Sequence, residues 1–231
     1  MKIAIVYITK DRLFYVDRSL PAMLKNTGFD FDLYIIDNGS HDGTLEYVSG
    51  YKDKRIKRLI RNSINLGQRI PINWFWKNCP ADLLGKFDDD MIPPEGWLEK
   101  MASIFISKSN GIGVVGGCAF HPDDINSVNY EHNIIKIGDN QMLRQYHVGG
   151  YCYLIPKSVV DKFGSIRFNF TTFQHRIHRA GLKNGYAYPF IKMTNMEDPR
   201  FGMRHPSRPV PSDSNAWVAN NIFLLSETVS D

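Results

Sequence analysis

Three consecutive carboxylates, Asp88, Asp89 and Asp90, are the side chains of this sequence best suited to chemistry. An apolar run, residues 83–87, leads into them, and two prolines follow. Adjacent like charges repel, and a carboxylate buried without a partner is costly. The triplet is therefore either a surface turn that keeps its charges in water or a site for a divalent cation. In an extended segment residues i and i+2 point to the same side, so we expect Asp88 and Asp90 to share one ion while Asp89 points away.

The cation interpretation carries a prediction about the substrate. Mg²⁺ or Mn²⁺ held by one or two carboxylates usually takes its remaining ligands from substrate phosphates and water. The triplet therefore indicates an enzyme that acts on a compound with a diphosphate group.

The elements that lead to the triplet alternate between two patterns. Four apolar runs of strand length are expected to form buried strands, at residues 3–8, 32–37, 55–60 and 83–87. Amphipathic helical spacing separates them, over residues 12–26, over residues 65–79 and in a short stretch after Thr44. This alternation is typical of right-handed βαβ units. It predicts an α/β fold with a mostly parallel central sheet flanked by helices.

Polar clusters occupy the ends of three predicted strands, at residues 9–12, 37–40 and 88–90. In a parallel sheet, ligands bind outside the carboxyl ends of the strands. Because these clusters come from three different strands, we expect them to converge on one edge of the sheet and to form a single site.

The second half of the chain has a less regular pattern. Helices are expected at residues 95–108, 156–163 and 173–180, strands at 111–120, 151–155 and 186–190, and a hairpin at 133–144. The hairpin predicts a small antiparallel region beside the main sheet. Four prolines after Thr194 prevent a regular pattern, so residues 194–231 are expected to form an irregular tail, either a lid or an arm along the body.

Length and composition indicate a single domain with its own core, since the chain has 231 residues of which 43% are hydrophobic. No apolar run approaches the roughly 18 residues of a membrane span, so none is expected. Residues 1–8 resemble the start of a signal peptide but lack a cleavage site, which favours a buried strand. Cys79, Cys118 and Cys152 are scattered and are expected to be free thiols, which favours the cytoplasm.

The net charge of +4 is mild, but the basic residues concentrate in one stretch: Lys52, Lys54, Arg55, Lys57, Arg58 and Arg61. Charges of this kind protect an exposed sheet edge from pairing with other chains. The same charges could attract an acidic acceptor, a membrane surface or nucleic acid. The sequence leaves both interpretations open.

Four motifs in this order resemble a known family. They are Thr9-Lys10-Asp11-Arg12, the run 35–44 with its Asp-Asn-Gly-Ser and Asp-Gly-Thr, Asn65-Leu66-Gly67, and Asp88 to Asp90 followed by residues 94–98. Together they closely resemble the family 2 glycosyltransferases of the GT-A fold. The resemblance covers roughly residues 2–118 and continues more weakly through 149–156 and 176–181. It implies one domain, residues 1–193, with a nucleotide-sugar-binding half at 1–118 and an acceptor-side half at 119–193.

The resemblance assigns site residues by position. It places the metal, Mn²⁺ or Mg²⁺, on Asp88 and Asp90, the two acids of a D-x-D motif. It implies donor contacts for the following residues: Thr9, Arg12, Asp37, Asn38, Ser40, Gly67, Arg69, Asn73 and Asp89. In the family the threonine-to-arginine segment and the aspartate of the second strand hold the nucleotide base and ribose.

The sequence departs from the family pattern in two places. Where the family usually has an Arg-Asn pair, this chain has Ile72-Asn73, and Arg69 one turn earlier could serve instead. Before Arg176 the family commonly carries a Glu-Asp pair that supplies the catalytic base, and this chain has no acid there.

The missing pair leaves several candidates for the base. We predict His175 or Asp198, and other acids remain open: Asp123, Asp124 and Glu197. A retaining reaction, which needs no such base, is also open. His175 and His178 could equally be surface histidines on a helix.

The resemblance further implies a histidine near the end of the fold as a metal ligand. The matching segment is Phe201-Gly202-Met203-Arg204-His205, which predicts His205, with His147 and His121 as competing candidates. Neutral imidazole suits Mn²⁺ beside carboxylates, and a ligand on the tail would close the tail over the bound donor.

The function that follows from these motifs is metal-dependent transfer of a sugar from a nucleotide-diphosphate-sugar, a UDP-sugar in first place, to an acceptor hydroxyl. The acceptor is not readable, although an acidic glycan, lipid carrier or nucleic acid fits the basic stretch. One alternative is a nucleotidyltransferase, which attacks the α-phosphate, but residues 9–12 lack the glycine-rich loop of such enzymes. The other is a non-catalytic module that binds sugar or nucleic acid.

Overall fold

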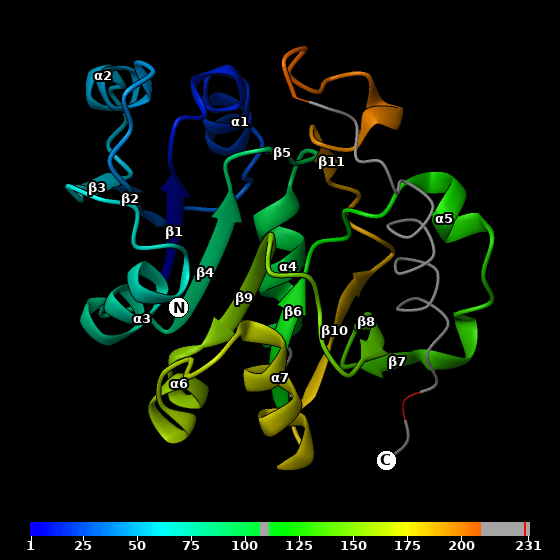
Figure 1. Cartoon of the computed structure of the whole chain (residues 1–231). Coiled ribbons are helices and arrows are strands. Elements are labelled where there is room, and N and C mark those ends of the chain that lie inside the picture. Colours follow the sequence, from blue (N-terminus) through cyan, green and yellow to red (C-terminus); the bar gives the residue numbers. More distant parts are fainter. Residues whose placement is uncertain (107–110, 209–228, 230–231) are drawn as a thin grey trace.

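A nine-stranded sheet runs through the whole molecule (Figure 1). The structure is a computed structural model that describes residues 1–106, 111–208 and 229. The strands follow each other across the sheet in the order β3-β2-β1-β4-β9-β6-β10-β8-β7. Their bounds are β1 Ile3–Thr9, β2 Asp32–Asp37, β3 Ile56–Arg61, β4 Leu83–Asp88, β6 Ile112–Gly116, β7 Ile134–Ile137, β8 Asn140–Gln145, β9 Cys152–Pro156 and β10 Lys183–Tyr188.

The sheet combines parallel and antiparallel pairing. Strands β3, β2, β1 and β4 are parallel to one another, as the alternating pattern of the first half predicts. Strand β9 lies between β4 and β6 and is antiparallel to both, while β6 and β10 are parallel. The β7–β8 hairpin then closes this side of the sheet with antiparallel pairs. The predicted α/β class and its antiparallel region are confirmed.

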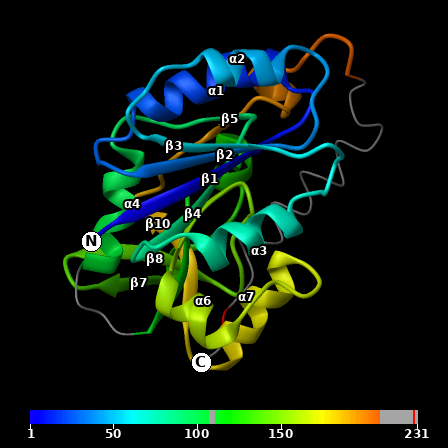
Figure 2. The ribbon, with the colours of Figure 1, turned by 90° about the vertical axis from the view of Figure 1, so that its left-hand side faces the viewer.

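Helices cover both faces of the sheet (Figure 2). Helices α1 and α4 pack on one face, where buried Leu20 and Trp97 join the core, and α2 lies beside α1. Helices α3, α6 and α7 pack on the other face, where Trp76 and Phe173 join a second core. The helix bounds are α1 Leu13–Lys25, α2 Thr44–Gly50, α3 Arg69–Asn78, α4 Trp97–Ile106, α5 Pro122–Asn126, α6 Lys157–Phe163 and α7 Phe170–Arg179, with short 3₁₀ turns at Glu131–Asn133 and Pro199–Phe201.

The segment after β10 is more ordered than its prolines suggest. Strand β11, Thr194–Asn195, pairs with β5, Met91–Ile92, directly after the acidic triplet (Figure 1). This pairing brings residues 196–208 to the carboxyl edge of the sheet. The predicted irregular tail thus contains a two-residue strand and a short 3₁₀ turn in its first part, and its role as a lid or an arm stays a prediction. Residues 209–228 and 230–231 of this tail lie outside the described residues.

The fold bears on two other sequence predictions. All three cysteines are buried free thiols, as their scatter suggests. Within the described part of the chain, no helix has the length and apolar composition needed to cross a membrane. The predicted donor and acceptor halves share one sheet through the β4–β9 pairing, and their division of labour stays a prediction.

Candidate active site

The three polar clusters do converge on one edge of the sheet. Thr9 and Asp37 are partners across the β1–β2 pairing, and Ile8, the neighbour of Thr9, is the partner of Asp88 across β1–β4. The side chains of Thr9 and Asp37 are buried, at 2% and 0% exposure. Neighbouring parallel strands thus bring the ends of β1, β2 and β4 together, as the sequence predicts.

The acidic triplet is a turn and not an extended segment. Strand β4 ends at Asp88, and Asp89 and Asp90 form a turn that leads into β5. The peptide N–H of Met196 donates to the Asp90 carbonyl at 2.9 Å, which ties the turn to the C-terminal segment. The expected alternation, with Asp89 pointing away, is therefore wrong, because a turn does not keep the period of a strand.

A buried lysine neutralises the first carboxylate. Lys86, in the middle of β4, is 2% exposed, and its ammonium group pairs with Asp88 and donates to the Gly150 carbonyl at 2.6 Å. Lys86 is not among the site residues predicted from the sequence. Its signal was a lone cation inside an apolar strand, two residues before a carboxylate and so on the same side of the strand.

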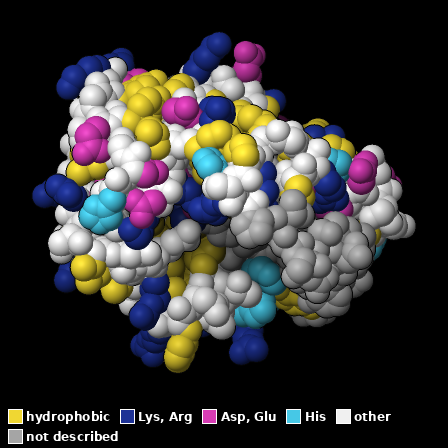
Figure 3. Space-filling model, turned by 45° about the horizontal axis from the view of Figure 1, so that its top comes forward, with side chains coloured by type: hydrophobic (Ala, Val, Ile, Leu, Met, Phe, Trp, Pro, Cys, Tyr) yellow, Lys and Arg dark blue, Asp and Glu magenta, His cyan; other side chains and the backbone are white. Residues whose placement is uncertain are grey.

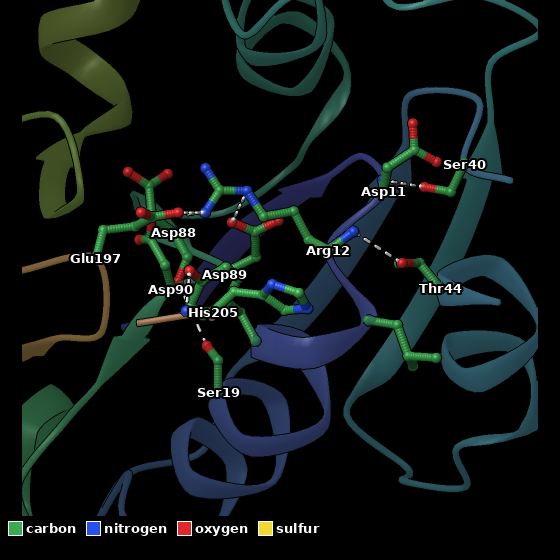
Figure 4. Close-up of polar contacts among 12 residues, drawn as sticks. Asp11, Arg12, Ser19, Ser40, Thr44, Asp88, Asp89, Asp90, Glu197 and His205 are labelled. Carbon is green, nitrogen blue, oxygen red and sulfur yellow. Dashed lines mark hydrogen bonds and ion pairs between the residues drawn. The ribbon is translucent and has the colours of Figure 1, made fainter. Parts of the chain in front are cut away.

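Arg12 neutralises the other two carboxylates (Figure 4). Its Nη1 lies 3.1 Å from Asp90 Oδ2 and 2.9 Å from Glu197 Oε1, and its Nε lies 3.8 Å from Asp89 Oδ1. Glu197 is itself held by Arg208 at 2.5 Å and Arg204 at 3.5 Å. The C-terminal segment is thus fastened to the acidic turn through one carboxylate shared by three arginines.

Burial sets the protonation of the turn. It raises the pKa of Asp89 to about 7, against the opposing effect of the nearby Arg12 charge. It also raises the pKa of Asp90 to about 6, and the neighbouring Asp88 charge adds to this increase. A cation placed among these carboxylates would relieve their mutual repulsion and favour the charged forms.

One carboxylate oxygen of Asp37 accepts hydrogen bonds from the backbone, and the other has no hydrogen-bond partner in the described residues. Oδ2 accepts from the peptide N–H groups of Gly39 and Ser40 at 3.1 and 3.0 Å, which fixes the turn after β2. Gly39 has φ +80°, a conformation that favours glycine. Oδ1 is buried and has no hydrogen-bond partner in the described residues. An unsatisfied buried acceptor at the ligand edge is a candidate contact for a donor hydroxyl or base N–H.

The turn motif after β2 holds Arg12 in place (Figure 4). Ser40 Oγ accepts from the Asp11 N–H at 2.9 Å, and Thr44 Oγ1 accepts from the Arg12 N–H at 3.0 Å. Asp42 Oδ2 accepts from the Leu13 N–H at 3.0 Å, at the start of α1. The Asn-Gly-Ser-His-Asp-Gly-Thr run therefore positions the β1–α1 loop, and Ser40 acts on the site through Arg12.

Four other predicted donor residues make contacts within the protein. Asn38 bridges the 62–67 loop, because it accepts from Asn62 at 2.8 Å and donates to the Gly67 carbonyl at 2.9 Å. Asn73 exchanges two bonds of 2.9 Å with the Ile166 backbone, and Arg69 donates to the Arg167 carbonyl at 2.6 Å. Contacts of these residues with a donor remain a prediction.

His205 lies against α1 and not beside Asp88. Its Nδ1 accepts from the Ser207 N–H at 3.1 Å, its ring packs edge-on against Phe14 at 4.5 Å, and its own N–H donates to the Tyr15 hydroxyl at 2.9 Å. It lines a cavity of about 490 Å³ together with Arg12 (Figure 4). A role for His205 as metal ligand stays a prediction.

The two predicted bases have different surroundings. His175, on α7, is half-buried, and its Nε2 lies 3.1 Å from Nδ1 of His147. Asp198 is fully buried, and Arg200 pairs with it at 2.9 Å and also with Asp124 at 2.8 Å. Both acids are committed to this arginine, so His175 is the better placed of the two to meet a substrate.

The donor set of the turn fits a divalent cation. Asp90 Oδ1 is buried without a hydrogen-bond partner in the described residues, and Asp88 contributes hard oxygen atoms from the same turn. No group of three or more His, Cys, Asp or Glu side chains that could hold a metal occurs within residues 1–106, 111–208 and 229. The protein thus offers two carboxylates, and water and substrate phosphates would supply the other ligands.

Comparisons with known proteins concern the sequence and the fold of the chain. At 29% identity over 104 residues, the chain is similar to an uncharacterized glycosyltransferase from Haemophilus influenzae, which covers 44% of the chain and 32% of that protein. The chain thus spans about a third of the length of this curated relative.

Two solved structures share the fold at low sequence identity. A mannosyltransferase from Pyrobaculum calidifontis, in complex with GDP-Man and Mn²⁺, superposes with a TM-score of 0.66 at 12% identity, over 96% of this chain and 69% of that one. TarS from S. aureus, residues 1–349 with UDP-GlcNAc, superposes with a TM-score of 0.63 at 13% identity, over 96% and 67%. The family profile described as glycosyl transferase family 2 matches residues 4–179. This match covers most of the chain, and the protein belongs to glycosyl transferase family 2.

Proposed function

We propose that this protein transfers a sugar from a nucleotide-diphosphate-sugar to an acceptor hydroxyl with the help of Mn²⁺ or Mg²⁺. One observation carries the proposal. Two buried carboxylate oxygens without partners in the described residues lie at the same sheet edge: Oδ1 of Asp37 at the end of β2, and Oδ1 of Asp90 in the turn after β4. The first suits the donor hydroxyls or base, and the second suits a cation that binds the diphosphate.

Asp88 and Asp90 would hold the cation. When bound, it would act as a Lewis acid that stabilises the charge of the departing nucleoside diphosphate. The Lys86 ammonium beside Asp88 keeps that carboxylate oriented at the end of β4. Arg12 now bonds to Asp90 and Glu197, and its guanidinium is close enough to the turn to bind diphosphate oxygens once the donor is present.

The donor end of the site is built on β1 and β2. Thr9 and Asp37 would contact the ribose and base, with Asn38, Ser40 and Gly67 maintaining the loops around them. The related folds were solved with GDP-Man in one case and UDP-GlcNAc in the other, so both nucleotides belong in a first screen. A UDP-sugar remains our first expectation.

His175 would accept the proton of the acceptor hydroxyl. Its pairing with His147 at 3.1 Å holds the ring in one orientation, and it lines an open pocket beside α7. A ring held in this way can act as a general base if it comes within hydrogen-bond reach of the acceptor. His175→Ala should then lower kcat while the release of nucleotide in the absence of acceptor continues.

A nucleotidyltransferase is the weaker candidate. Enzymes of that kind carry a glycine-rich loop after the first strand, and residues 10–12 of this chain place Lys10, Asp11 and Arg12 there. In this loop the one residue with a positive φ is Asp11, at +50°, where a glycine-rich loop would have glycine. A non-catalytic binding module would keep the nucleotide contacts without turnover.

Slow hydrolysis of the donor tests these alternatives. The protein is incubated with a set of UDP- and GDP-sugars and Mn²⁺, with and without a chelator, and the products are separated. A glycosyltransferase releases free sugar and nucleoside diphosphate, and the chelator stops the release. Release of nucleoside monophosphate and sugar 1-phosphate would indicate attack on the α-phosphate, as in nucleotidyl transfer, and binding without any of these products would indicate a non-catalytic module.

A further inference from the structure

A second pocket, of about 430 Å³, lies beside α7 on the face of the sheet that carries α3 and α6. Its lining is basic and aromatic: Arg167, Phe168, Thr172, His175, Arg176 and Arg179. Phe168 is 81% exposed, far more than any buried aromatic of the core. A pocket with three arginines and an exposed ring has the composition of a site for an anionic, ring-containing ligand.

The sequence around the pocket contains no acid. Between Asp161 and Glu197 there is not one aspartate or glutamate, and this stretch carries six lysines and arginines. In Figure 3, dark blue side chains protrude from the lower part of the view, and the magenta side chains gather in its upper part. The stretch that lines the pocket is therefore basic, even though the net charge of the whole chain is only +4.

The pocket arginines have no carboxylate partner within the described residues. Arg176 donates to the Phe163 carbonyl at 2.5 Å and its guanidinium lies 5.2 Å from the centre of the Phe173 ring. Its Nε is buried and has no hydrogen-bond partner in the part of the chain that the structure describes. A buried N–H of a charged group without an acceptor is costly, and the guanidinium groups that line the pocket are suited to bind an anion there.

Helix stabilisation explains only part of this arrangement. Arg176 and Arg179 lie in the last turn of α7, where cations interact favourably with the helix dipole. Arg167 lies in the loop before the helix, and its backbone is fixed there by the bond from Arg69 at 2.6 Å. Neither the position of Arg167 nor the exposure of Phe168 follows from the needs of the helix.

The pocket is linked to the acidic turn through residues 147–150. His147 contacts His175 in the pocket, and Gly150 accepts from Lys86, the partner of Asp88. Phe170, the first residue of α7, packs on Tyr153 of β9 at 4.2 Å. One short loop therefore connects the place where the donor diphosphate is proposed to bind with the basic pocket.

We propose that this pocket binds a phosphate group carried on the acceptor sugar, with the sugar ring against Phe168. Three guanidinium groups match a phosphate, which offers three acceptor oxygens and up to two charges, better than a single carboxylate. The assignment to the acceptor rests on the proposed glycosyl transfer. The anion site itself rests only on the pocket.

Calorimetric titration of the full chain with glucose 6-phosphate, at constant ionic strength, tests the site. Wild type should bind the sugar phosphate saturably, and glucose should not bind measurably. Arg167→Gln and Arg179→Gln should each raise Kd about tenfold or more. Lys183→Gln, an exposed cation of the same acid-free stretch outside the pocket, should leave Kd unchanged, as should Asp90→Asn in the acidic turn. Equal affinities in wild type and both arginine variants would overturn the proposal.

Inorganic phosphate separates a sugar phosphate site from a site for free phosphate. Phe168→Ala should weaken glucose 6-phosphate and leave inorganic phosphate unaffected, and the exposed position of Phe168 makes a folding defect unexpected. If both ligands bind equally and Phe168→Ala changes neither, the acceptor assignment is overturned.

Donor hydrolysis, measured on the same proteins, distinguishes failure of this inference from failure of the proposed function. Hydrolysis in wild type and in the arginine variants, together with loss of phosphate binding in the variants, supports both. Hydrolysis without pocket binding overturns the inference alone. Pocket binding without any hydrolysis would overturn both the acceptor assignment and the proposed function, and the pocket would then be an anion site of another kind.

Discussion

Lys86 and Arg12 form ion pairs with different carboxylates of the acidic turn. Lys86 pairs with Asp88 from within the sheet, and Arg12 pairs with Asp90 and Glu197 from the loop before α1. Carboxylates in a buried place need such partners, because an unpaired buried charge is costly. Lys86 and Arg12 therefore have a structural role in addition to any contact with substrate.

Replacement of the buried cation should show this structural role. Lys86→Met leaves the Asp88 carboxylate without its ammonium partner and should cost about 3 kcal/mol of unfolding free energy. The double variant with Asp88→Asn should recover most of that loss, because neither charge remains. Lys157→Met removes a lysine from an exposed pair with Asp161 and serves as the control, with a change below about 0.5 kcal/mol. Urea denaturation measures all four proteins, and similar losses for both lysines would contradict this account.

Asp37 provides the second test at this scale. In Asp37→Asn the amide oxygen keeps the bonds from Gly39 and Ser40, while an NH₂ group replaces the unpartnered Oδ1. The contact is expected in both the ground state and the transition state, so KM for the donor should rise about tenfold with little change in kcat. Steady-state kinetics measures both constants. An unchanged KM with a lower kcat would assign Asp37 a different role.

The C-terminal segment holds itself together through a second cluster of charges. Arg200, in the 3₁₀ turn after β11, bonds to Asp198, which is 2% exposed, and to Asp124 of α5, also 2% exposed. Hydrogen bonds to Asp124, and then to Asp198, raise the pKa of Arg200. This one arginine joins the segment that carries Glu197 to α5.

Arg200→Met should therefore be strongly destabilising. Two buried carboxylates lose the guanidinium group that bonds to both of them, and the expected loss is about 3 kcal/mol or more. Lys183→Met, in which an exposed cation is replaced on β10, is the matched control and should change stability by less than about 0.5 kcal/mol. Thermal and urea unfolding measure the difference. A loss of the same size in both variants would show that the cluster does not join these segments.

The histidines around α7 should make stability depend on pH. Burial, and then the nearby His175, lower the pKa of His147 below its usual 6.5, and burial lowers the pKa of His178 in the same direction. The folded chain then binds fewer protons than the unfolded chain near pH 6. The contribution of these histidines to the free energy of unfolding is therefore fully present above about pH 6.5 and is lost as the pH falls.

Urea midpoints at pH 7.5 and 5.5 measure this effect. The difference between the two midpoints should be smaller in His147→Asn than in wild type, whatever the absolute stability of the variant. His132→Asn changes an exposed histidine and should keep the wild-type difference. If His147→Asn also keeps the wild-type difference between the two midpoints, protonation of His147 does not destabilise the folded protein, and the prediction is wrong.

The sequence predicts the first half of the fold more accurately than the second half. Strands β1, β2, β3 and β4 agree with the expected ranges to within a residue or two, because buried parallel strands are continuous apolar runs. Helix α7 begins three residues earlier than its apolar spacing suggests. An Asn169–Thr172 capping box, which is polar, starts it. The β5–β11 pair is two residues long on each side and leaves no periodic signal.

The candidate site was also predicted only in part. The strand ends that carry Thr9, Asp37 and Asp88 were placed correctly, since parallel topology alone brings them together. The turn at Asp89 and Asp90, the ion pairs of Arg12 and the basic pocket depend on contacts between residues far apart in the sequence. Such contacts are set by tertiary packing and have no local pattern from which to read them.

The acidic turn is the centre of the account, and metal binding tests it most directly. Mn²⁺ is titrated calorimetrically into wild type, Asp90→Asn and Asp139→Asn, each with saturating nucleoside diphosphate. Asp139 lies exposed in the β7–β8 turn and controls for the lost charge. The account predicts that Asp90→Asn weakens Mn²⁺ by about tenfold or more, on the order of 1.4 kcal/mol, while Asp139→Asn binds as wild type does. Equal Mn²⁺ affinity in all three proteins would contradict it.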